Sequence, residues 1–283
     1  MISIIILSYN TQDLLVRCLS SVFSTITSEA IEIIVVDNAS QDGSVAQVKK
    51  KFPQVLMVEN TQNVGFAAGC NIGAKKAKGD LLVFLNSDTE FSDPKTLTYM
   101  KESMETDDTG IVGGLLKNAD GTYQRSFGAF YTLPSITKML FLGEKHEMSQ
   151  QNFTTVQTVD WVSGGFMMVQ RTVFEKVGGF DEKIFMYVED VEFCYRVLRL
   201  GNHIIVDPRA VVSHVGQGSS NRDFAIVKIY EGLQYFYKKH ESSVEYTLLK
   251  ILLGLKAIGV IIFGTIMRRP FLVKRYSEAF KTL

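Results

Sequence analysis

The chain has 283 residues, of which 30 are basic and 30 acidic, so its formal net charge at pH 7 is zero. This balance argues against a nucleic-acid-binding protein, because such proteins usually carry an excess of basic residues. Hydrophobic residues make up 46% and charged residues 21%, which is typical of a globular chain with one large domain or one domain with additions. The three cysteines form no C-x-x-C pair and lack metal-ligand spacing, which indicates a reducing compartment.

Strand and helix patterns alternate through residues 1–100. The apolar start at 2–7 is too short for a signal peptide and lacks a basic flank, so we expect a strand there. The further expected elements are strands over 32–36, 55–58 and 81–85 and helices over 15–26, from Asp42 onward and over 64–77, the first capped by Asn10 or Thr11. Continuous apolar strands that alternate with helices predict a mostly parallel α/β sheet covered on both faces.

The pattern is less regular after Ile111. Residues 118–157 mix polar and aromatic side chains without a clear period, which indicates loops or short antiparallel strands. Beyond this tract we expect strands over 166–169 and 203–206 and helices over 189–200 and 224–239. We therefore predict a catalytic domain over 1–220 and a C-terminal helical region over 221–283.

The C-terminal region contains the one segment with a membrane signature. Residues 247–267 are almost wholly apolar but include Lys250 and Lys256, and four basic residues follow: Arg268, Arg269, Lys274 and Arg275. The segment is long enough to span a bilayer, yet lysines inside a membrane are costly. We therefore expect a helix that lies in the membrane interface, held by apolar burial and by attraction to anionic lipid. A soluble packing helix or an oligomer contact is the alternative.

Polar side chains follow every expected strand of the first half. Ligands of open parallel sheets bind beyond the carboxyl ends of the strands, so these residues are the informative ones. Asparagine and aspartate are also common in turns and helix caps, so each residue alone has a structural explanation. Their convergence on one edge predicts a site built from Ser8-Tyr9-Asn10, Asp37-Asn38, Asn60 and Asn86-Ser87-Asp88.

Two competing enzyme classes lack their glycine-rich loops. A dinucleotide-binding enzyme would use Asp37 on the ribose, but it needs a G-x-G-x-x-G turn after the first strand, and residues 8–13 contain no glycine. A nucleotidyltransferase would carry a glycine-rich, basic loop at the same place, and none is present there. Both classes are therefore disfavoured.

Glycines recur later, at steps of four. Gly65, Gly69 and Gly73 share one helical face, although each costs about 1 kcal/mol relative to alanine within a helix. The glycine stripe would let a backbone or a flat ligand approach closely. Close packing of the helix on the sheet explains Gly69 and Gly73 equally well, whereas Asn63 and Gly65 lie nearer the expected pocket.

Three carboxylates carry candidate chemistry. Asp88 is the metal candidate, because Mg²⁺ or Mn²⁺ takes oxygen ligands and neutralises the charge on a departing diphosphate. Glu189 and Asp190 open a predicted helix, where acidic residues are favoured by the helix dipole. The glycine and aromatic residues at 178–187 are an unusual context for a plain cap, so the pair is a candidate general base. His214 alone would be an ordinary hydrogen-bonded histidine.

Taken together, the motifs resemble the family-2 glycosyltransferases of the GT-A (Rossmann-like) fold, and they are most similar to the bacterial rhamnosyltransferase branch. Each segment is weak alone, but seven segments in the right order over residues 1–218 make the match specific. They are Ser8-Tyr9-Asn10; the run 36–44 with Asp37-Asn38; Asn63-x-Gly65-x-Ala67-x-Gly69-x-Asn71; Leu85-Asn86-Ser87-Asp88; Trp161-x-x-Gly164-Gly165; Gly178-Gly179-Phe180-Asp181-Glu182; and Glu189-Asp190-Val191-Glu192.

The resemblance implies a role for each matching residue. Asp37 would hold the nucleotide base, and Asn86, which replaces the first aspartate of a D-x-D-type motif, would contact the ribose through its amide. Asp88 and His214 would bind Mg²⁺ or Mn²⁺. Asp190 would be the catalytic base, with Glu189 as the second candidate. The implied nucleotide-sugar site comprises Ser8, Tyr9, Asn10, Asp37, Asn38, Asn63, Gly65, Asn86, Ser87, Asp88, Trp161, Gly164 and Gly165, the last three lining the sugar and acceptor pocket.

The implied reaction is one in-line displacement with inversion at the anomeric carbon. The branch implies dTDP-L-rhamnose as donor, with UDP-linked sugars as the alternative. The acceptor would be a polyprenyl-diphosphate-linked glycan or a surface polysaccharide at the cytoplasmic face of the plasma membrane, and a homo-oligomer is open. A binding protein that has lost catalysis is the other class, and the retained Asp88, Asp190 and His214 argue against it.

Overall fold

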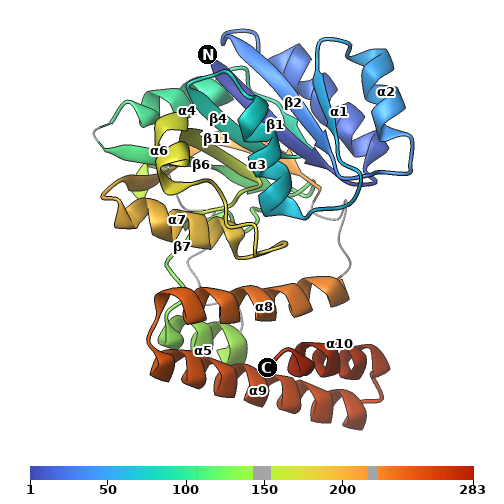
Figure 1. Ribbon diagram of the computed structural model, residues 1–283, viewed down its shortest axis with the longest axis vertical. Coiled ribbons are helices and arrows are strands. Elements are labelled where there is room, and N and C mark those ends of the chain that lie inside the picture. Colours follow the sequence, from blue (N-terminus) through green and yellow to red (C-terminus); the bar gives the residue numbers. More distant parts are fainter. Residues whose placement is uncertain (107, 143–153, 216–221) are drawn as a thin grey trace. The chain divides into compact units, whose positions relative to one another are not determined.

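The computed structural model describes residues 1–106, 108–142, 154–215 and 222–283 (Figure 1). These residues belong to two compact units, each of which we describe by itself. The first unit comprises 1–129, 150–185 and 189–219, and the second comprises 130–149, 186–188 and 220–283.

The first unit is built on one large sheet. Its strands follow the order β3-β2-β1-β4-β10-β6-β11-β5, and β8 pairs with β11. A small second sheet pairs β7 (Phe127–Gly128) with β9 (Trp161–Val162). The strands of the large sheet are β1 (Ile2–Ser8), β2 (Ile31–Asp37), β3 (Leu56–Glu59), β4 (Leu81–Asn86), β5 (Thr89–Phe91), β6 (Thr109–Lys117), β8 (Gln157–Thr158), β10 (Phe166–Gln170) and β11 (His203–His214).

The predicted parallel arrangement is confirmed for the first four strands: β1 pairs in parallel with β2 and β4, and β2 with β3. Strand β10 was expected at the right residues, but it runs antiparallel to both neighbours, β4 and β6. Strand β11 reaches His214, well beyond the expected end at Val206, and its pairing with β6 shifts register between Val206 and Val211.

Helices cover both faces of the sheet (Figure 1). On β1, the side chains of Ile4 and Ile6 pack in one core with Leu15 and Leu19 of α1 and Met100 of α4. The next residues along β1 point to the opposite face, which α3 covers. The helices of this unit are α1 (Gln12–Thr25), α2 (Ser44–Lys51), α3 (Phe66–Lys76), α4 (Thr96–Met104), α6 (Arg171–Val177) and α7 (Glu189–Arg199).

The glycine stripe on α3 serves packing. A Cβ atom on Gly69 would overlap the Leu7 side chain, and one on Gly73 would lie 2.5 Å from Ile5 Cγ2. Both glycines therefore bring α3 close to β1, which confirms the packing explanation for these two positions.

Strand β6 is a central element that the sequence pattern did not reveal. It is buried over almost its whole length, although Gly113 and Gly114 interrupt its apolar run. A Cβ on Gly113 would lie 2.5 Å from the Val162 side chain, and a Cβ on Gly114 would overlap the Phe166 ring. The strand thus carries glycine where the side chains of Val162 and Phe166 fill the space that a Cβ atom would occupy.

The second unit is helical, with α5 (Leu133–Leu142), α8 (Arg222–His240), α9 (Ser243–Ile266) and α10 (Pro270–Lys281). Helix α9 begins with a capping box, in which the Ser242 and Glu245 side chains each accept a backbone N–H of the other. Leu249, Leu253 and Ala257 are buried residues of α9, and α5, α8 and α10 all contact this helix. Among the helices that the structure describes, α9 alone is long and apolar enough to cross a membrane, judged by length and composition.

We predict that Gly114→Ala destabilises the first unit by about 1–3 kcal/mol, because overpacking a filled core forces side chains and backbone to shift. The new Cβ would overlap the buried Phe166 ring and lie 2.8 Å from the Ala210 carbonyl oxygen. The control is Gly259→Ala in α9, where nothing lies within 4 Å of the added methyl group. Urea unfolding followed by circular dichroism measures both, and a parent-like midpoint for Gly114→Ala contradicts the packing account.

Candidate active site

The register of the central strands brings their polar ends together. Ser8 at the end of β1 lies opposite Asp37 at the end of β2, and Leu7 lies opposite Asn86 at the end of β4. Strand ends that finish at one level place their following residues at one edge of the sheet. This edge gathers the predicted residues of the first half of the chain.

Three hydroxyl groups link the loops at this edge. Thr11 Oγ1 lies 3.0 Å from Ser8 Oγ and 3.0 Å from Ser87 Oγ, and all three side chains are buried. Thr11 occupies the cap position of α1, but its side chain forms no capping hydrogen bond. Its hydroxyl instead ties the turn after β1 to the end of β4.

Asp37 presents a buried acceptor at the end of β2. Asp37 is 2% exposed, and its Oδ2 accepts a 2.9 Å hydrogen bond from the Ser40 backbone N–H. Oδ1 is buried and has no partner among the described residues. An unpaired buried acceptor is costly, so this oxygen is suited to an N–H group supplied by a ligand.

The chain around Asp37 is tied to the turn after β1. Asn10, which has a left-handed backbone with φ 53°, donates its N–H to Ser40 Oγ, and its Oδ1 accepts from Gln41 N at 2.8 Å. Tyr9 precedes it and is partly exposed. The predicted Ser8-Tyr9-Asn10 segment and the Asp37 loop therefore form one rigid corner.

The asparagines of the next loop bind one another. Asn38 Nδ2 donates to Asn63 Oδ1 and to the Gly65 carbonyl, both at 3.2 Å, while Asn38 Oδ1 accepts from Asn60 at 2.8 Å. Gly65 has φ 86°, and a Cβ there would overlap the Phe185 carbonyl oxygen. These predicted site residues hold the loop after β3 in place. The group that approaches Gly65 closely is the backbone of Phe185.

Asp88 and His214 face each other from neighbouring strand ends. His214 Nε2 lies 3.1 Å from Asp88 Oδ1 and 3.1 Å from Asn86 Nδ2, and both ionisable side chains are largely buried. The Gln124 amide oxygen lies 2.6 Å from His214 Nδ1, so Nδ1 carries a proton and Nε2 is the ring nitrogen that faces Asp88. A proton or a cation between Nε2 and the Asp88 carboxylate oxygen would make this close contact favourable.

These donor atoms fit a divalent cation. A metal-binding histidine usually donates its second ring N–H to an oxygen, as His214 does to Gln124. No cluster of three or more histidine, cysteine or acidic residues suited to a metal occurs in the part of the chain that the structure describes. A cation at Asp88 and His214 would therefore complete its coordination with oxygens from water or ligand. Gln124 lies in the irregular tract, and no sequence signal identified it.

A glycine turn connects the two halves of the site. The Gly165 carbonyl accepts a 3.0 Å hydrogen bond from Asn86 N, and Gly164 N donates to Asp190 Oδ2 at 3.1 Å. A Cβ on Gly165 would lie 3.0 Å from Asn86 Nδ2, and one on Gly164 would lie 3.0 Å from the Phe66 ring. Both predicted glycines therefore sit where the β4 edge and the start of α7 approach each other.

The acidic pair opens α7, as predicted. Asp190 is partly exposed, and its second oxygen, Oδ1, accepts from Val191 N at 2.8 Å. Glu189 is 6% exposed, and its Oε2 has no partner among the described residues. Of the two carboxylates, Asp190 is the one that a substrate in solution can reach.

Burial sets the protonation of both carboxylates. Desolvation raises the pKa of Asp190, while the N–H groups of Gly164 and Val191 and the charge of Arg125 act against this rise. Desolvation and the Asp190 charge raise the pKa of Glu189 well above its usual range. Both groups thus hold protons more tightly than exposed carboxylates, as a general base near neutral pH requires.

Trp161 lies next to Arg125. Its ring is buried, the indole N–H donates to the Ala129 carbonyl at 2.9 Å, and the Arg125 guanidinium lies 5.1 Å from the ring centre. Trp161 therefore supports Arg125. Sequence reasoning missed Arg125, although it is the single arginine of the irregular tract at 118–157.

Comparison with known families agrees with this geometry. The family model described as glycosyl transferase family 2 matches residues 3–178, which include β1 to β4 and β10. The chain belongs to glycosyl transferase family 2. It is thus a glycosyltransferase, and the predicted family and GT-A fold are confirmed.

Curated family-2 relatives include bacterial rhamnosyltransferases. The chain is 24% identical to the N-acetylglucosaminyl-diphospho-decaprenol L-rhamnosyltransferase of Mycobacterium tuberculosis over 246 residues, covering 78% of each chain. It is 26% identical to rhamnosyltransferase WbbL of Escherichia coli over 233 residues, covering 79% of this chain and 86% of WbbL.

Solved structures share the fold at lower sequence identity. The mannosyltransferase PcManGT of Pyrobaculum calidifontis, determined in complex with GDP-Man and Mn²⁺, matches with a TM-score of 0.59 and 15% identity. The match covers 99% of this chain and 85% of the mannosyltransferase.

Proposed function

We propose that this family-2 enzyme transfers L-rhamnose from dTDP-L-rhamnose to a hydroxyl group of a lipid-linked or surface-polysaccharide acceptor, with inversion. The proposal rests on three features that meet at one sheet edge. They are the Asp37 oxygen that lacks a partner among the described residues, the Asp88–His214 pair, and the Gly164–Gly165 turn that holds Asp190. The names of the relatives support the sugar and a lipid-linked acceptor. A UDP-linked donor is the alternative.

The nucleotide would bind across the ends of β1, β2 and β4. Thymine and uracil both carry an imide N–H, and Asp37 Oδ1 offers the buried acceptor for it. Asn86 would contact the ribose through its amide, and the Ser8, Thr11 and Ser87 hydroxyls would keep this edge rigid. Rigid binding groups keep the donor aligned for attack at the anomeric carbon.

Asp88 and His214 would hold Mg²⁺ or Mn²⁺, with Gln124 fixing the histidine tautomer. A divalent cation there would neutralise the charge that develops on the leaving diphosphate. The relative that was determined with a nucleotide sugar also contains Mn²⁺, which supports the choice of ion.

Asp190 would act as the general base. The N–H groups of Gly164 and Val191 fix its carboxylate, and its exposure lets an acceptor hydroxyl approach. As the acceptor oxygen attacks the anomeric carbon, Asp190 takes the hydroxyl proton and the bond to the nucleotide diphosphate breaks. Attack on the face opposite the leaving group inverts the configuration.

The C-terminal region over 221–283 would lie on the cytoplasmic face of the plasma membrane, while the domain over 1–220 performs catalysis. One face of α9 carries exposed apolar side chains at steps of three and four, namely Val244, Leu248, Ile251, Leu255, Ile258 and Ile262. Lys256 turns away from this stripe and donates to the Leu140 carbonyl, and Lys250 lies 5.8 Å from the Tyr246 ring centre. An uncharged stripe on one side of the helix supports a position along the membrane surface.

Removal of divalent cations should abolish transfer, and Mn²⁺ or Mg²⁺ should restore it. Asp88→Ala should lose metal-dependent donor binding, and Gln124→Ala should weaken activation by Mn²⁺ about 10–100-fold because the His214 tautomer is no longer fixed. The control is Asp80→Ala, which removes an exposed carboxylate from the other end of β4. Titration of activity with Mn²⁺ measures these effects, and full activity in excess chelator would refute the metal site.

Asp190→Asn should lower kcat about 10²–10⁴-fold, because the amide keeps the size of the side chain but cannot accept the hydroxyl proton. Donor Kd should change little. Glu189→Gln should cost less in kcat, since Glu189 is buried away from solvent. If Glu189→Gln is inactive while Asp190→Asn keeps the parent rate, the base is Glu189, and if both variants are active it lies elsewhere.

Replacing two members of the exposed α9 stripe, Leu255→Asp and Ile258→Asp together, should release the full chain from vesicles that contain anionic lipid. Each lost apolar contact is worth about 1.5–3 kcal/mol, or roughly tenfold or more in binding. The control is Leu56→Asp, which replaces an exposed leucine of β3. Vesicle sedimentation measures binding. Equal binding of the double variant contradicts the membrane role, and a change in particle size by ultracentrifugation would indicate an oligomer contact.

A further inference from the structure

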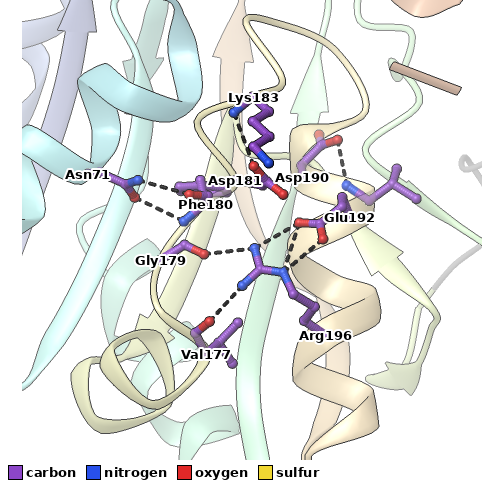
Figure 2. A network of polar contacts seen from close by, with 10 residues as sticks. Asn71, Val177, Gly179, Phe180, Asp181, Lys183, Asp190, Glu192 and Arg196 are labelled. Atoms are coloured by element: carbon purple, nitrogen blue, oxygen red, sulfur yellow. Dashed lines mark hydrogen bonds and ion pairs between the residues drawn. The ribbon is translucent and has the colours of Figure 1, made fainter. Parts of the chain in front are cut away.

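Glu192 and Arg196 form an ion pair on α7, the helix that also carries Asp190 (Figure 2). The Glu192 side chain is 0% exposed, and both of its oxygens accept hydrogen bonds of 2.8–2.9 Å from the Arg196 guanidinium. The same guanidinium donates to the carbonyls of Val177 and Gly179, each at 2.8 Å. Arg196 thus uses its planar set of donors on three partners at once.

These contacts fasten α7 to the end of α6. Val177 is the last residue of α6, and Gly178 and Gly179 follow with φ of 86° and 73°. The carbonyls at a helix end need donors from outside the regular helix, and Arg196 supplies one to Val177 and another to Gly179 in the turn that follows. The turn after α6 therefore takes its position from a side chain of α7.

Asn71 of α3 holds the other side of the same turn (Figure 2). Its Oδ1 accepts from Phe180 N and its Nδ2 donates to the Phe180 carbonyl, both at 2.9 Å. A second bond from Nδ2 reaches Glu182 Oε1 at 3.0 Å. The turn is thus fixed from α3 and from α7, and it gives α7 an anchor on the body of the unit.

Glu192 and Asp190 share the first turn of α7. The Asp190 carboxylate depends on that turn, because one of its oxygens accepts from Val191 N on α7 and the other from Gly164 N on the facing loop. A small movement of the helix start would keep the first bond and stretch the second. The position of α7 therefore decides where the carboxylate lies relative to the glycine turn.

Stability alone gives a weak reason for such a pair. Replacing a buried ion pair by well-packed apolar residues is often neutral or stabilising, because desolvation offsets the Coulomb attraction. Aromatic residues already fill the surroundings, with Phe174, Phe180 and Phe193 in mutual ring contact. What the pair adds is directional bonding that fixes one position of the helix.

We propose that the Glu192–Arg196 pair is a positioning element that sets the location of Asp190 in the transfer reaction. The inference rests on the proposed role of Asp190 as the base. Neither Glu192 nor Arg196 touches the reacting atoms on this account; they act through the helix start.

The chain offers a control in a second pair with a buried carboxylate, although its arginine is more exposed, at 44% against 19% for Arg196. Asp207 is also 0% exposed, and Arg209 binds it with both Nε and Nη2, at 2.8 Å for the shortest bond. The further partners of this pair are Ser103 and Glu102, on or beside α4. Both pairs join a buried carboxylate to an arginine, but one is attached to α7 and the other to β11 and α4.

The test compares Arg196→Lys with Arg209→Lys in the full chain. Lysine has a single ammonium group and cannot serve two carboxylate oxygens and two carbonyls in fixed geometry. We expect Arg196→Lys to lower kcat about 10–100-fold, since a misplacement of about 1 Å costs on the order of 10²-fold, with donor Kd unchanged. Arg209→Lys should keep the parent kcat, and its loss of stability in urea is measured beside that of Arg196→Lys.

The pH profile gives a second readout that a general loss of stability would not move. Stretching the Gly164 bond removes a contact that favours the ionised carboxylate, so the pKa of Asp190 rises. The acid limb of kcat for Arg196→Lys should therefore move to higher pH. The charged or titratable groups that act on Asp190 are Glu189 on its own helix and Arg125 across from it, with Cys194 further along α7, and none of them is changed.

Each outcome decides the proposal. Equal kcat values and equal acid limbs for the two lysine variants would overturn it. If Arg196→Lys does not fold, Glu192→Gln replaces it, with Asp207→Asn as control and the same expected split. Asp190→Asn is measured alongside: if that variant keeps the parent kcat, the base assignment fails and the positioning role falls with it, whereas an inactive Asp190→Asn beside a normal Arg196→Lys refutes the positioning role alone.

Discussion

The antiparallel pairing of β10 with β4 is the constraint on which the site depends. Because β10 runs against β4, with Phe166 opposite Leu85, its first residues lie beside the last residues of β4. The Gly164–Gly165 turn that precedes β10 therefore reaches Asn86 on one side and Asp190 on the other. If β10 ran parallel to β4, its last residues would lie at this edge instead. The Gly164–Gly165 turn would then be at the other end of the strand, and Asp190 on α7 would lose its bond to Gly164.

The second constraint is electrostatic. Asp37, Asp88, Glu189 and Asp190 all belong to this part of the first unit, and three of them are buried. Asp37 and Glu189 each keep a buried oxygen without a partner in the described structure. On the proposed account, a ligand N–H pairs with the Asp37 oxygen, and a cation lies between Asp88 and His214. Folded stability and ligand binding are then linked, because a ligand that binds the folded chain alone stabilises it.

The sequence predicted the first four strands because each is a continuous apolar run followed by polar residues, as at Asp37 and Asn86. It did not predict β6, since Gly113 and Gly114 interrupt the apolar pattern for the sake of neighbouring side chains. The direction of β10 depends on pairing partners, which local periodicity does not encode. Gln124 and Arg125 were missed for a related reason, because they lie in an irregular tract that only the tertiary fold brings to the site.

The most direct test of the account is the anomalous scattering of Mn²⁺ in crystals of the protein grown with dTDP. The account predicts a manganese peak bonded to the Asp88 carboxylate, to His214 Nε2 and to diphosphate oxygens, with the thymine N–H directed at Asp37 Oδ1. Manganese bound away from both Asp88 and His214, or dTDP bound away from the ends of β1, β2 and β4, would contradict it.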